Sequence, residues 1–346
     1  MVSNILFIRI YRKKVVLAGA GSEQIVPNSF CEHRIGQHII FTAHFIPLNQ
    51  PLSRQPFFNR DTLLLLRIPF SYYLFPVFLL GASVSAWNDP RSLLIVFIAL
   101  HFFIYPGSNI YNSYMDRDTG SIGGVEHPPP VTRNMYYVSM LFDVTGILVC
   151  LLSGWKNMAL VAGYIAFSKS YSWHGIRLKK YPFLGWLSVA FFQGGYTFML
   201  ASMVALDNVS IHWFTGSHLE GMLFASLMIG GSYPLTQIYQ HAEDAARGDH
   251  SISYRLGIRG SFIFSGGFFL LAAVVALHYF SNWYTPRYFI IFSSCLAPVI
   301  MYFLYWFTGT LRNSCRADYR HSMWMNQIAA TCMIICFCLF LADRFL

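Results

Sequence analysis

The sequence predicts an all-α integral membrane protein with about nine transmembrane helices. Of its 346 residues, 55% are hydrophobic and only 11% are charged, whereas soluble domains carry about 25% charged residues. Runs of about 20 mostly apolar residues, the length that crosses a bilayer as a helix, recur along the chain. Strand-like alternation is absent from these runs, so helices are the structure that satisfies the backbone in lipid.

The loops between the predicted helices alternate in charge. Loops after even-numbered spans are long and rich in arginine and lysine, whereas loops after odd-numbered spans hold few basic residues. Because basic loops stay in the cytoplasm, we expect the N-terminus and every even loop on that side, in a bacterial inner membrane. The predicted spans are 66–87, 92–112, 135–152, 157–172, 184–206, 219–239, 261–280, 288–309 and 324–343.

Residues 1–60 differ from the rest of the chain. A short apolar start is followed by a basic triplet at 12–14, whereas a secretory signal carries its positive charge before the apolar stretch. The polar stretch that follows contains several prolines and shows no clear period. We interpret 1–60 as a poorly ordered tail and hypothesise that it over-extends the natural reading frame. Residues 61–346 are expected to form one polytopic transmembrane domain.

Cysteine content and net charge narrow the class of partner. Several of the seven cysteines fall inside apolar runs, and none forms a CxxC pair, so we interpret them as small packing residues. The formal net charge of +9 comes with the basic loops of a membrane protein. We therefore expect membrane lipid, and no nucleic acid, as a partner. The oligomeric state stays open.

The most informative feature is an internal repeat. The segment PGSNIYNSYMD at 106–116 recurs as PLTQIYQHAED at 234–244, 128 residues later. Each copy reads proline, two residues, an amide, isoleucine, tyrosine, an amide, three residues and aspartate. Each copy also ends an apolar run and opens into an acidic loop, which favours a shared function over two chance helix ends. Because spans two and six run parallel, both copies are expected on the cytoplasmic side.

The residue types of the repeat favour a magnesium site. Asn112 and Asp116 are four residues apart, so they share one face if the helix continues past the proline. Amide and carboxylate oxygens are hard ligands that suit Mg²⁺ better than zinc or copper. Further carboxylates follow both copies, at Asp118 and Asp249 among others. Two copies that face each other could hold two metal ions around one polyanion.

A basic loop and several aromatic residues accompany the repeat. Arg177, Lys179 and Lys180 lie on the same predicted side of the membrane, where they either serve positive-inside retention or bind phosphate. Tyrosines near both copies could stabilise a carbocation through their ring faces. Asp143, in the third span, faces either protein or lipid, and the sequence leaves this open.

Together these features suggest a ligand with a diphosphate head and an apolar tail. A prenyl diphosphate has this form. Metal ions would neutralise the charge that develops as the diphosphate leaves, and apolar walls would shield the allylic cation from water. A lipophilic and probably aromatic acceptor would then attack the cation.

At these residues the chain resembles the UbiA family of intramembrane prenyltransferases. The first motif of that family is similar to the segment from Asn112 to Gly120, and the second to the segment from Gln240 to Asp249, with a Leu-Gly pair beyond it. The loop that contains Tyr171 and Arg177 looks like the family's basic loop after span four. The resemblance covers about 61–346 and implies a UbiA-like bundle with two aspartate-rich cytoplasmic motifs.

The resemblance also implies an activity and roles for individual residues. The activity is Mg²⁺-dependent transfer of a polyprenyl group from its diphosphate, which would make the protein a prenyltransferase. Asp116 and Asp244 are the implied catalytic residues. The implied metal ligands are Asn112, Asp116, Asp118, Asp244 and Asp249, and the implied substrate-binding residues are Tyr111, Asn112, Arg177, Lys179, Tyr239 and Gln240.

Three positions depart from the family pattern. Ser113 stands where the family often has aspartate, Gly120 stands where the last aspartate of the first motif belongs, and Gln240 stands where the second motif usually starts with aspartate. Asp118 and Glu243 could replace the lost charge, because carboxylate binding to Mg²⁺ tolerates intervening water.

Two other functions compete with prenyl transfer. An internal repeat also occurs in membrane transporters and lipid-binding proteins, but transporter repeats place their sites at the bilayer midplane, and here the polar groups gather near one surface. The second alternative is a family member that binds a prenyl diphosphate without catalysis. The acceptor and the prenyl chain length are not fixed by the sequence.

Overall fold

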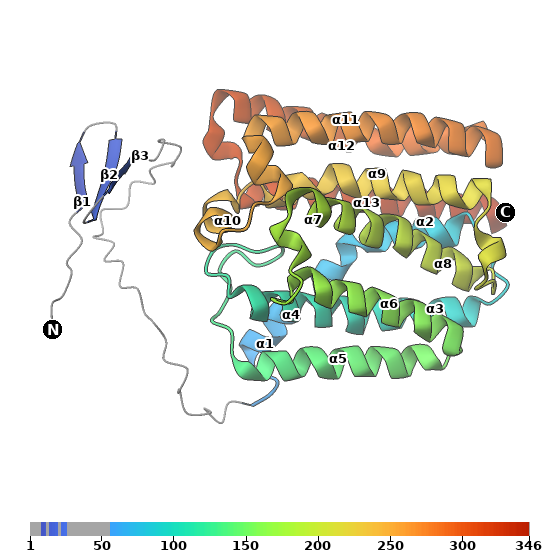
Figure 1. Ribbon diagram of the computed structural model, residues 1–346. Helices are drawn as coiled ribbons and strands as arrows, with labels where there is room; N and C mark the ends of the chain where they lie inside the picture. Colours follow the sequence, from blue (N-terminus) through green and yellow to red (C-terminus); the bar gives the residue numbers. More distant parts are fainter. Residues whose placement is uncertain (1–7, 12–13, 20–21, 26–55, 346) are drawn as a thin grey trace.

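The computed structural model describes residues 8–11, 14–19, 22–25 and 56–345. From residue 56 onwards the chain forms a bundle of long helices that run side by side, with short connections at both ends (Figure 1). Within this described region, every one of the predicted spans is helical. The prediction of an all-α membrane bundle is therefore confirmed for this part of the chain.

Six of the predicted spans are each covered by one long helix, and three are built from successive segments. The single helices are α5 (Arg133–Leu151), α6 (Trp155–Ser172), α9 (Gly216–Gln237), α11 (Ile252–Trp283), α12 (Pro286–Arg312) and α13 (Tyr319–Phe345). The segmented spans are α1 (Arg60–Leu66), η1 (Ile68–Tyr73) and α2 (Phe75–Ser83); α3 (Pro90–Ile98), η2 (Ala99–Ile104) and α4 (Tyr105–Asp116); and α7 (Pro182–Val189), η4 (Ala190–Tyr196) and α8 (Thr197–Ala205).

Shorter elements lie in the loops and in the N-terminal segment. The short helices are η3 (Leu178–Lys180), η5 (Ile211–Trp213), α10 (His241–Arg247) and η6 (Ser314–Arg316). Three antiparallel strands, in the order β1-β2-β3, lie where the sequence predicts a tail: β1 (Ile8–Tyr11), β2 (Lys14–Gly19) and β3 (Ser22–Ile25). Most of the predicted tail lies outside the described residues, so its boundary near residue 60 stays a prediction.

Seven helical stretches of the described chain are long and apolar enough to cross a membrane, judged by length and composition. The helices α6 and α9 are not among them, so the count of nine spans stays a prediction. The helix α9 packs against α11, η4, α7, α8 and α13, and a helix enclosed in this way tolerates a more polar sequence than one that faces lipid. The protein is a multi-pass membrane protein.

Local sequence signals explain where several helices begin. The side chain of Asn59 accepts a hydrogen bond from the backbone N–H of Thr62 at 2.8 Å, which caps α1. Asp89 caps α3 in the same way by accepting from the N–H of Ser92 at 3.0 Å. Such caps satisfy backbone donors that have no partner within the helix.

Two spans contain a π-helical segment near their middle. η2 precedes α4, and η4 lies between α7 and α8. A π segment inserts an extra residue into an α-helix and often occurs at functional sites. Pro106, which has no N–H to donate, is the second residue of α4, just after η2. Each segment therefore changes which residues of its span face the interior.

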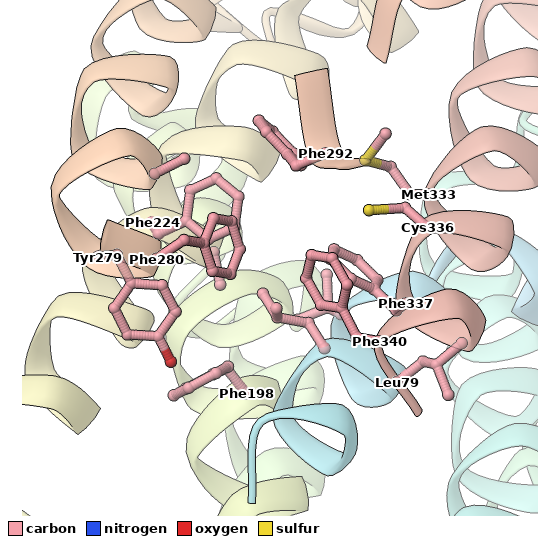
Figure 2. Close-up of a cluster of buried hydrophobic side chains, with 14 of the residues drawn as sticks. Leu79, Phe198, Phe224, Tyr279, Phe280, Phe292, Met333, Cys336, Phe337 and Phe340 are labelled. Atoms are coloured by element: carbon pink, nitrogen blue, oxygen red, sulfur yellow. The ribbon is translucent and has the colours of Figure 1, made fainter. Parts of the chain in front are cut away.

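Aromatic side chains from several helices form the largest buried cluster (Figure 2). The ring of Phe224 on α9 lies 5.7 Å from that of Phe280 on α11 and 5.3 Å from that of Phe292 on α12, both edge-on. Small residues let the helices approach closely elsewhere: a Cβ on Gly194 would lie 2.7 Å from the carbonyl oxygen of Ala225. Such close packing is what holds helices together in lipid.

Candidate active site

Both copies of the repeat line one cavity of about 300 Å³ at the same end of the bundle. The matched amides and aspartates of the two copies all contribute to its wall, although 128 residues separate them in the chain. The three pairs are Asn109 and Gln237, Asn112 and Gln240, and Asp116 and Asp244. The structure thus brings together what the sequence repeats.

The first copy lies on a continuous helix. Asn112 and Asp116 both belong to α4 and both line the cavity, as their spacing of four predicts. The Oδ1 atom of Asn112 is buried and has no hydrogen-bond partner among the described residues. Asp116 forms an ion pair with Lys179 of η3. This copy therefore presents one open amide oxygen and one carboxylate held by a cation.

The second copy lies across a break between two helices. The helix α9 ends at Gln237, and Asp244 belongs to the separate short helix α10. Asp244 is 6% exposed, and its Oδ2 atom accepts a hydrogen bond from the hydroxyl of Ser251 at 3.1 Å. Asp249 follows in the same acidic loop, and its backbone N–H donates to the carbonyl of Asp244 at 2.9 Å.

The basic loop joins the two copies. Arg177 donates to Asp249 at 2.9 Å, and the Nζ atom of Lys179 lies 4.0 Å from the same carboxylate. Lys179 also pairs with Asp116, so one ammonium group lies between a carboxylate of the first copy and one in the acidic loop that follows the second. Coulombic attraction is strong in such a partly desolvated place. These ion pairs place the basic loop at the site, in addition to any role of its charge in keeping the loop in the cytoplasm.

Two of the three departures from the family pattern, Gly120 and Gln240, lie where the two motifs contact each other. The Oε1 atom of Glu243 accepts hydrogen bonds from the backbone N–H groups of Thr119 at 2.8 Å and Gly120 at 3.1 Å. A Cβ on Gly120 would lie 2.6 Å from Glu243 Oε2. The amide of Gln240 donates to the carbonyl of Ser121 at 3.1 Å. The second motif thus supplies a carboxylate at the place where the first lacks a side chain.

The remaining predicted site residues are divided between the cavity and its surroundings. Asp118, Lys179 and Tyr239 line the cavity, together with Asp249. Arg177 is not in the cavity wall and reaches the site through Asp249. The roles that the sequence predicts for Asp118, Lys179, Tyr239 and Asp249 stay proposals, whereas Arg177, predicted to bind substrate, contacts a predicted metal ligand and not the cavity.

Tyr111 faces away from the cavity wall. Its ring lies 4.0 Å from the Nζ atom of Lys169, which forms a 2.7 Å ion pair with Asp143 and donates to Ser139 at 2.6 Å. Ser139 in turn donates to the carbonyl of Gly107 at 2.9 Å. Asp143 is 5% exposed, so it faces protein, which resolves the alternative that the sequence leaves open.

Several cavity residues were not predicted from the sequence. Arg67 ends α1 with a left-handed backbone (φ 47°) and donates to the carbonyls of Gly123 and Asn109. Gln237 donates to the hydroxyl of Tyr233 at 2.8 Å, and that hydroxyl also contacts Tyr171. The repeated amide at 109 and 237 was a usable signal. Nothing in the sequence marks the conformation of Arg67.

The donor set of the cavity suits a hard cation. Four carboxylates, from Asp116, Asp118, Asp244 and Asp249, line it beside the open amide oxygen of Asn112. All of these donors are oxygens, as Mg²⁺ prefers. Within the described residues, no three histidine, cysteine or acidic side chains are grouped closely enough to hold a metal ion as they stand. The carboxylates that a metal would use are held by Lys179 and Ser251 instead.

The fold is shared with solved structures of a UbiA homolog and of digeranylgeranylglyceryl phosphate synthase. A structure of a UbiA homolog from Archaeoglobus fulgidus bound to DMAPP and Mg²⁺ matches with a TM-score of 0.59 and 14% identity, covering 82% of this chain and 99% of that one. The same homolog bound to GPP and Mg²⁺ gives a TM-score of 0.58 at 14% identity, with the same coverage. A structure of digeranylgeranylglyceryl phosphate synthase gives 0.51 at 18% identity, covering 82% and 96%.

Comparison of the sequence itself gives a family assignment. A search of curated proteins finds no match. The model of the UbiA prenyltransferase family matches residues 73–328, which contain both copies of the repeat and the basic loop between them. The chain belongs to the UbiA prenyltransferase family.

Proposed function

We propose that this protein transfers a polyprenyl group from a prenyl diphosphate to a lipophilic, aromatic acceptor, with Mg²⁺ assisting departure of the diphosphate. The observation that carries the proposal is the convergence of both repeat copies on one cavity. Family membership supports prenyl transfer in general. The structures of a homolog with DMAPP or GPP and Mg²⁺ support this choice of substrate and ion.

The ligands for the metal would come from both copies. Asn112, Asp116 and Asp118 would hold it on one side, and Asp244 and Asp249 on the other. When bound, Mg²⁺ would neutralise the negative charge that builds up on the departing diphosphate. The orphaned oxygen of Asn112 supports this set, because a buried acceptor without a partner is costly unless a ligand satisfies it.

Of the two basic-loop cations at the site, Lys179 would bind the diphosphate oxygens directly. Lys179 lies between Asp116 and Asp249, so a diphosphate held between the copies would meet its ammonium group. Arg177 would orient Asp249 from outside the cavity. Charge-assisted hydrogen bonds of this kind are stronger than hydrogen bonds between neutral groups. They stabilise the departing diphosphate more than the intact substrate, because negative charge builds up on it as it leaves.

The apolar part of the cavity would hold the prenyl chain and the cation it becomes. Aromatic rings from three helices line this part, with Tyr105 on α4, Phe167 on α6 and Tyr233 on α9. Ring faces stabilise a nearby cation, and an apolar wall excludes the water that would quench it. Tyr239 and Gln240 would contact the substrate near the diphosphate end.

The same proposal includes a membrane orientation. We infer nine spans, with the N-terminus and both acidic motifs in the cytoplasm of a bacterial cell. The support is the concentration of arginine and lysine in loops at the motif end. Labelling of single cysteines introduced at Asp118 and Asp207, from each side of sealed vesicles, would test it. Labelling of both from one side would contradict this orientation.

The transporter alternative is less well supported. Transporter repeats place their ligands on broken helices at the midplane. Here Asp116 is the last residue of α4, and Asp244 lies on α10, beyond the end of α9. A family member without catalysis would retain the cavity and still lack turnover, so only an activity measurement separates it from an enzyme.

The proposed function is tested by diphosphate release. Purified protein in detergent would be given farnesyl or geranylgeranyl diphosphate with a panel of aromatic acceptors, with and without Mg²⁺. We expect release that requires Mg²⁺, and a prenylated product with the correct acceptor. Mg²⁺-dependent binding without release from either substrate would indicate the non-catalytic alternative. No binding at all would overturn the proposal.

A further inference from the structure

A second cavity lies at the motif end of the bundle, between the start of α11 and the end of α12. Its volume is about 620 Å³, and it shares no lining residue with the cavity that the two motifs line. Arg259, Leu256 and Gly257 line it from α11, and Leu311 and Arg312 from α12. We call it the α11–α12 groove.

The backbone explains why a groove forms here. The helix α11 contains a non-helical residue, Gly257, with φ 66° and ψ 177°, so its first turns bend away from the rest. The helix α12 ends at Arg312, opposite this bend. A Cβ added to Gly257 would meet nothing within 4 Å, which shows that the space beside the bend is open. The left-handed backbone is one that glycine adopts without strain.

The groove carries positive charge that nothing in the described chain neutralises. The guanidinium groups of Arg259 and Arg312 are exposed and make no ion pair or side-chain hydrogen bond with a described residue. No described carboxylate lines the groove. By contrast, Arg177 at the same end is paired with Asp249. Burial lowers the pKa of His241, another lining residue, to about 4, so the charge of the groove at neutral pH comes from the arginines.

The surface around the groove is apolar and exposed. Of the seven candidate membrane spans in the described chain, α11 and α12 have the smallest buried shares, 28% and 22%. Leu256 and Leu311 in the groove are 37% and 43% exposed, and beyond them Ile263 and Leu304 are 66% and 51% exposed. Positive charge thus gives way directly to exposed apolar surface along the two helices.

We propose that the α11–α12 groove binds the phosphate headgroup of an anionic membrane phospholipid, with its acyl chains along α11 and α12. The positive charge of the two arginines complements the negative charge of the headgroup. A phospholipid would also contact the exposed apolar surface beside them, whereas a free phosphate ion would not. Basic pockets between transmembrane helices bind anionic headgroups in this way. The exposed leucines would pack against the first methylene groups of the chains.

The test compares lipid retention by matched variants. Full-length protein in phosphatidylcholine nanodiscs that contain a minority of phosphatidylglycerol would be analysed by native mass spectrometry for bound lipid. We expect R259Q to weaken phosphatidylglycerol binding about fivefold and R259Q/R312Q about 30-fold, as one basic residue near an anionic surface contributes roughly a fivefold gain. The control R60Q/R320Q, which removes two exposed arginines outside the groove, should bind as the wild type does.

Three results would overturn the proposal. One is retention of phosphatidylglycerol by R259Q/R312Q at the wild-type level. Another is an equal loss of retention in R259Q/R312Q and in the control R60Q/R320Q, which would indicate an effect of general surface charge. The third is displacement of the lipid by millimolar inorganic phosphate, which would assign the groove to a soluble anion. Melting temperatures in pure phosphatidylcholine nanodiscs would show that every variant is folded.

Discussion

The two copies of the repeat have the same order of residue types and different backbones. In the first copy, the amide and the aspartate lie one turn apart on the continuous helix α4. In the second, Gln240 lies between the two helices, after α9 has ended at Gln237 and just before α10 begins at His241. The oxygen of the first amide has no hydrogen-bond partner in the described part of the chain, whereas the second amide donates to Ser121. One copy is therefore built as a rigid set of ligands and the other as a loop that reaches across to it.

The tyrosines of the two copies show the same difference. Tyr111 lies under the ammonium group of Lys169, outside the cavity wall. Tyr239 lines the cavity and packs edge-on against Tyr319, with ring centres 5.4 Å apart. The sequence repeat thus places the same functional groups in both copies, and the local backbone conformation determines which of these side chains line the cavity.

The largest expected effect comes from removing one carboxylate of either copy. D116N and D244N should each lower the rate of Mg²⁺-dependent diphosphate release by about 10²–10³-fold, the usual cost of losing one group that stabilises developing charge. Steady-state release measured in detergent checks this. D61N, at an exposed position on α1, is the control and should release diphosphate at the wild-type rate.

If D244N retains activity while D116N does not, the copies are unequal and the loop copy is dispensable. That outcome would replace the two-copy site with one based on α4 alone.

The next effect concerns the ion pair behind the first copy. K169M should lower the free energy of unfolding by about 3 kcal/mol, because it leaves the buried carboxylate of Asp143 without its cation. K169M/D143L should recover most of this loss, since both charges are then gone. Thermal unfolding in detergent measures both. A double variant less stable than K169M would contradict the account of this pair.

Lys179 should affect the two copies together. K179M is expected to raise KM for the prenyl diphosphate by about 10–100-fold, the range for losing a hydrogen bond to a charged group, because its ammonium group lies between Asp116 and Asp249. K180M is the neighbouring control and should leave KM unchanged. Equal effects of the two substitutions would show that the loop acts only through its overall charge.

The contact between the motifs should give the smallest effect. G120D places a carboxylate against Glu243 and should lower diphosphate release about tenfold through steric overlap and like charge. G120D/E243G moves the carboxylate from one motif to the other and should recover most of the activity. Losses that multiply in the double variant would mean that Glu243 does not replace the missing aspartate.

Hydropathy and the repeat predict most of the framework, because a membrane demands long apolar helices and the repeat marks their polar ends. The nine predicted helical regions, the shared face of Asn112 and Asp116 and the meeting of both copies follow from these rules. The number of regions that cross the membrane does not follow as directly, since α9 is enclosed by other helices and is less apolar.

Side-chain direction could not be predicted at the same level. The π segment η2 precedes the first copy, and one inserted residue rotates the following helix by roughly 100°. A count along the sequence therefore cannot tell that Tyr111 faces Lys169. The hydrogen bonds from Thr119 and Gly120 to Glu243 join residues more than 120 positions apart, and only the fold reveals them.

The most direct test of a single site built from both copies is to count bound ligand. Binding of a prenyl S-thiolodiphosphate, which resists ionisation, would be measured by calorimetry with Mg²⁺ for the wild type, D116N and D244N. The account predicts one molecule per wild-type chain and loss of binding in each variant. Two molecules per chain, with one lost in each variant, would contradict it and show that the copies act separately.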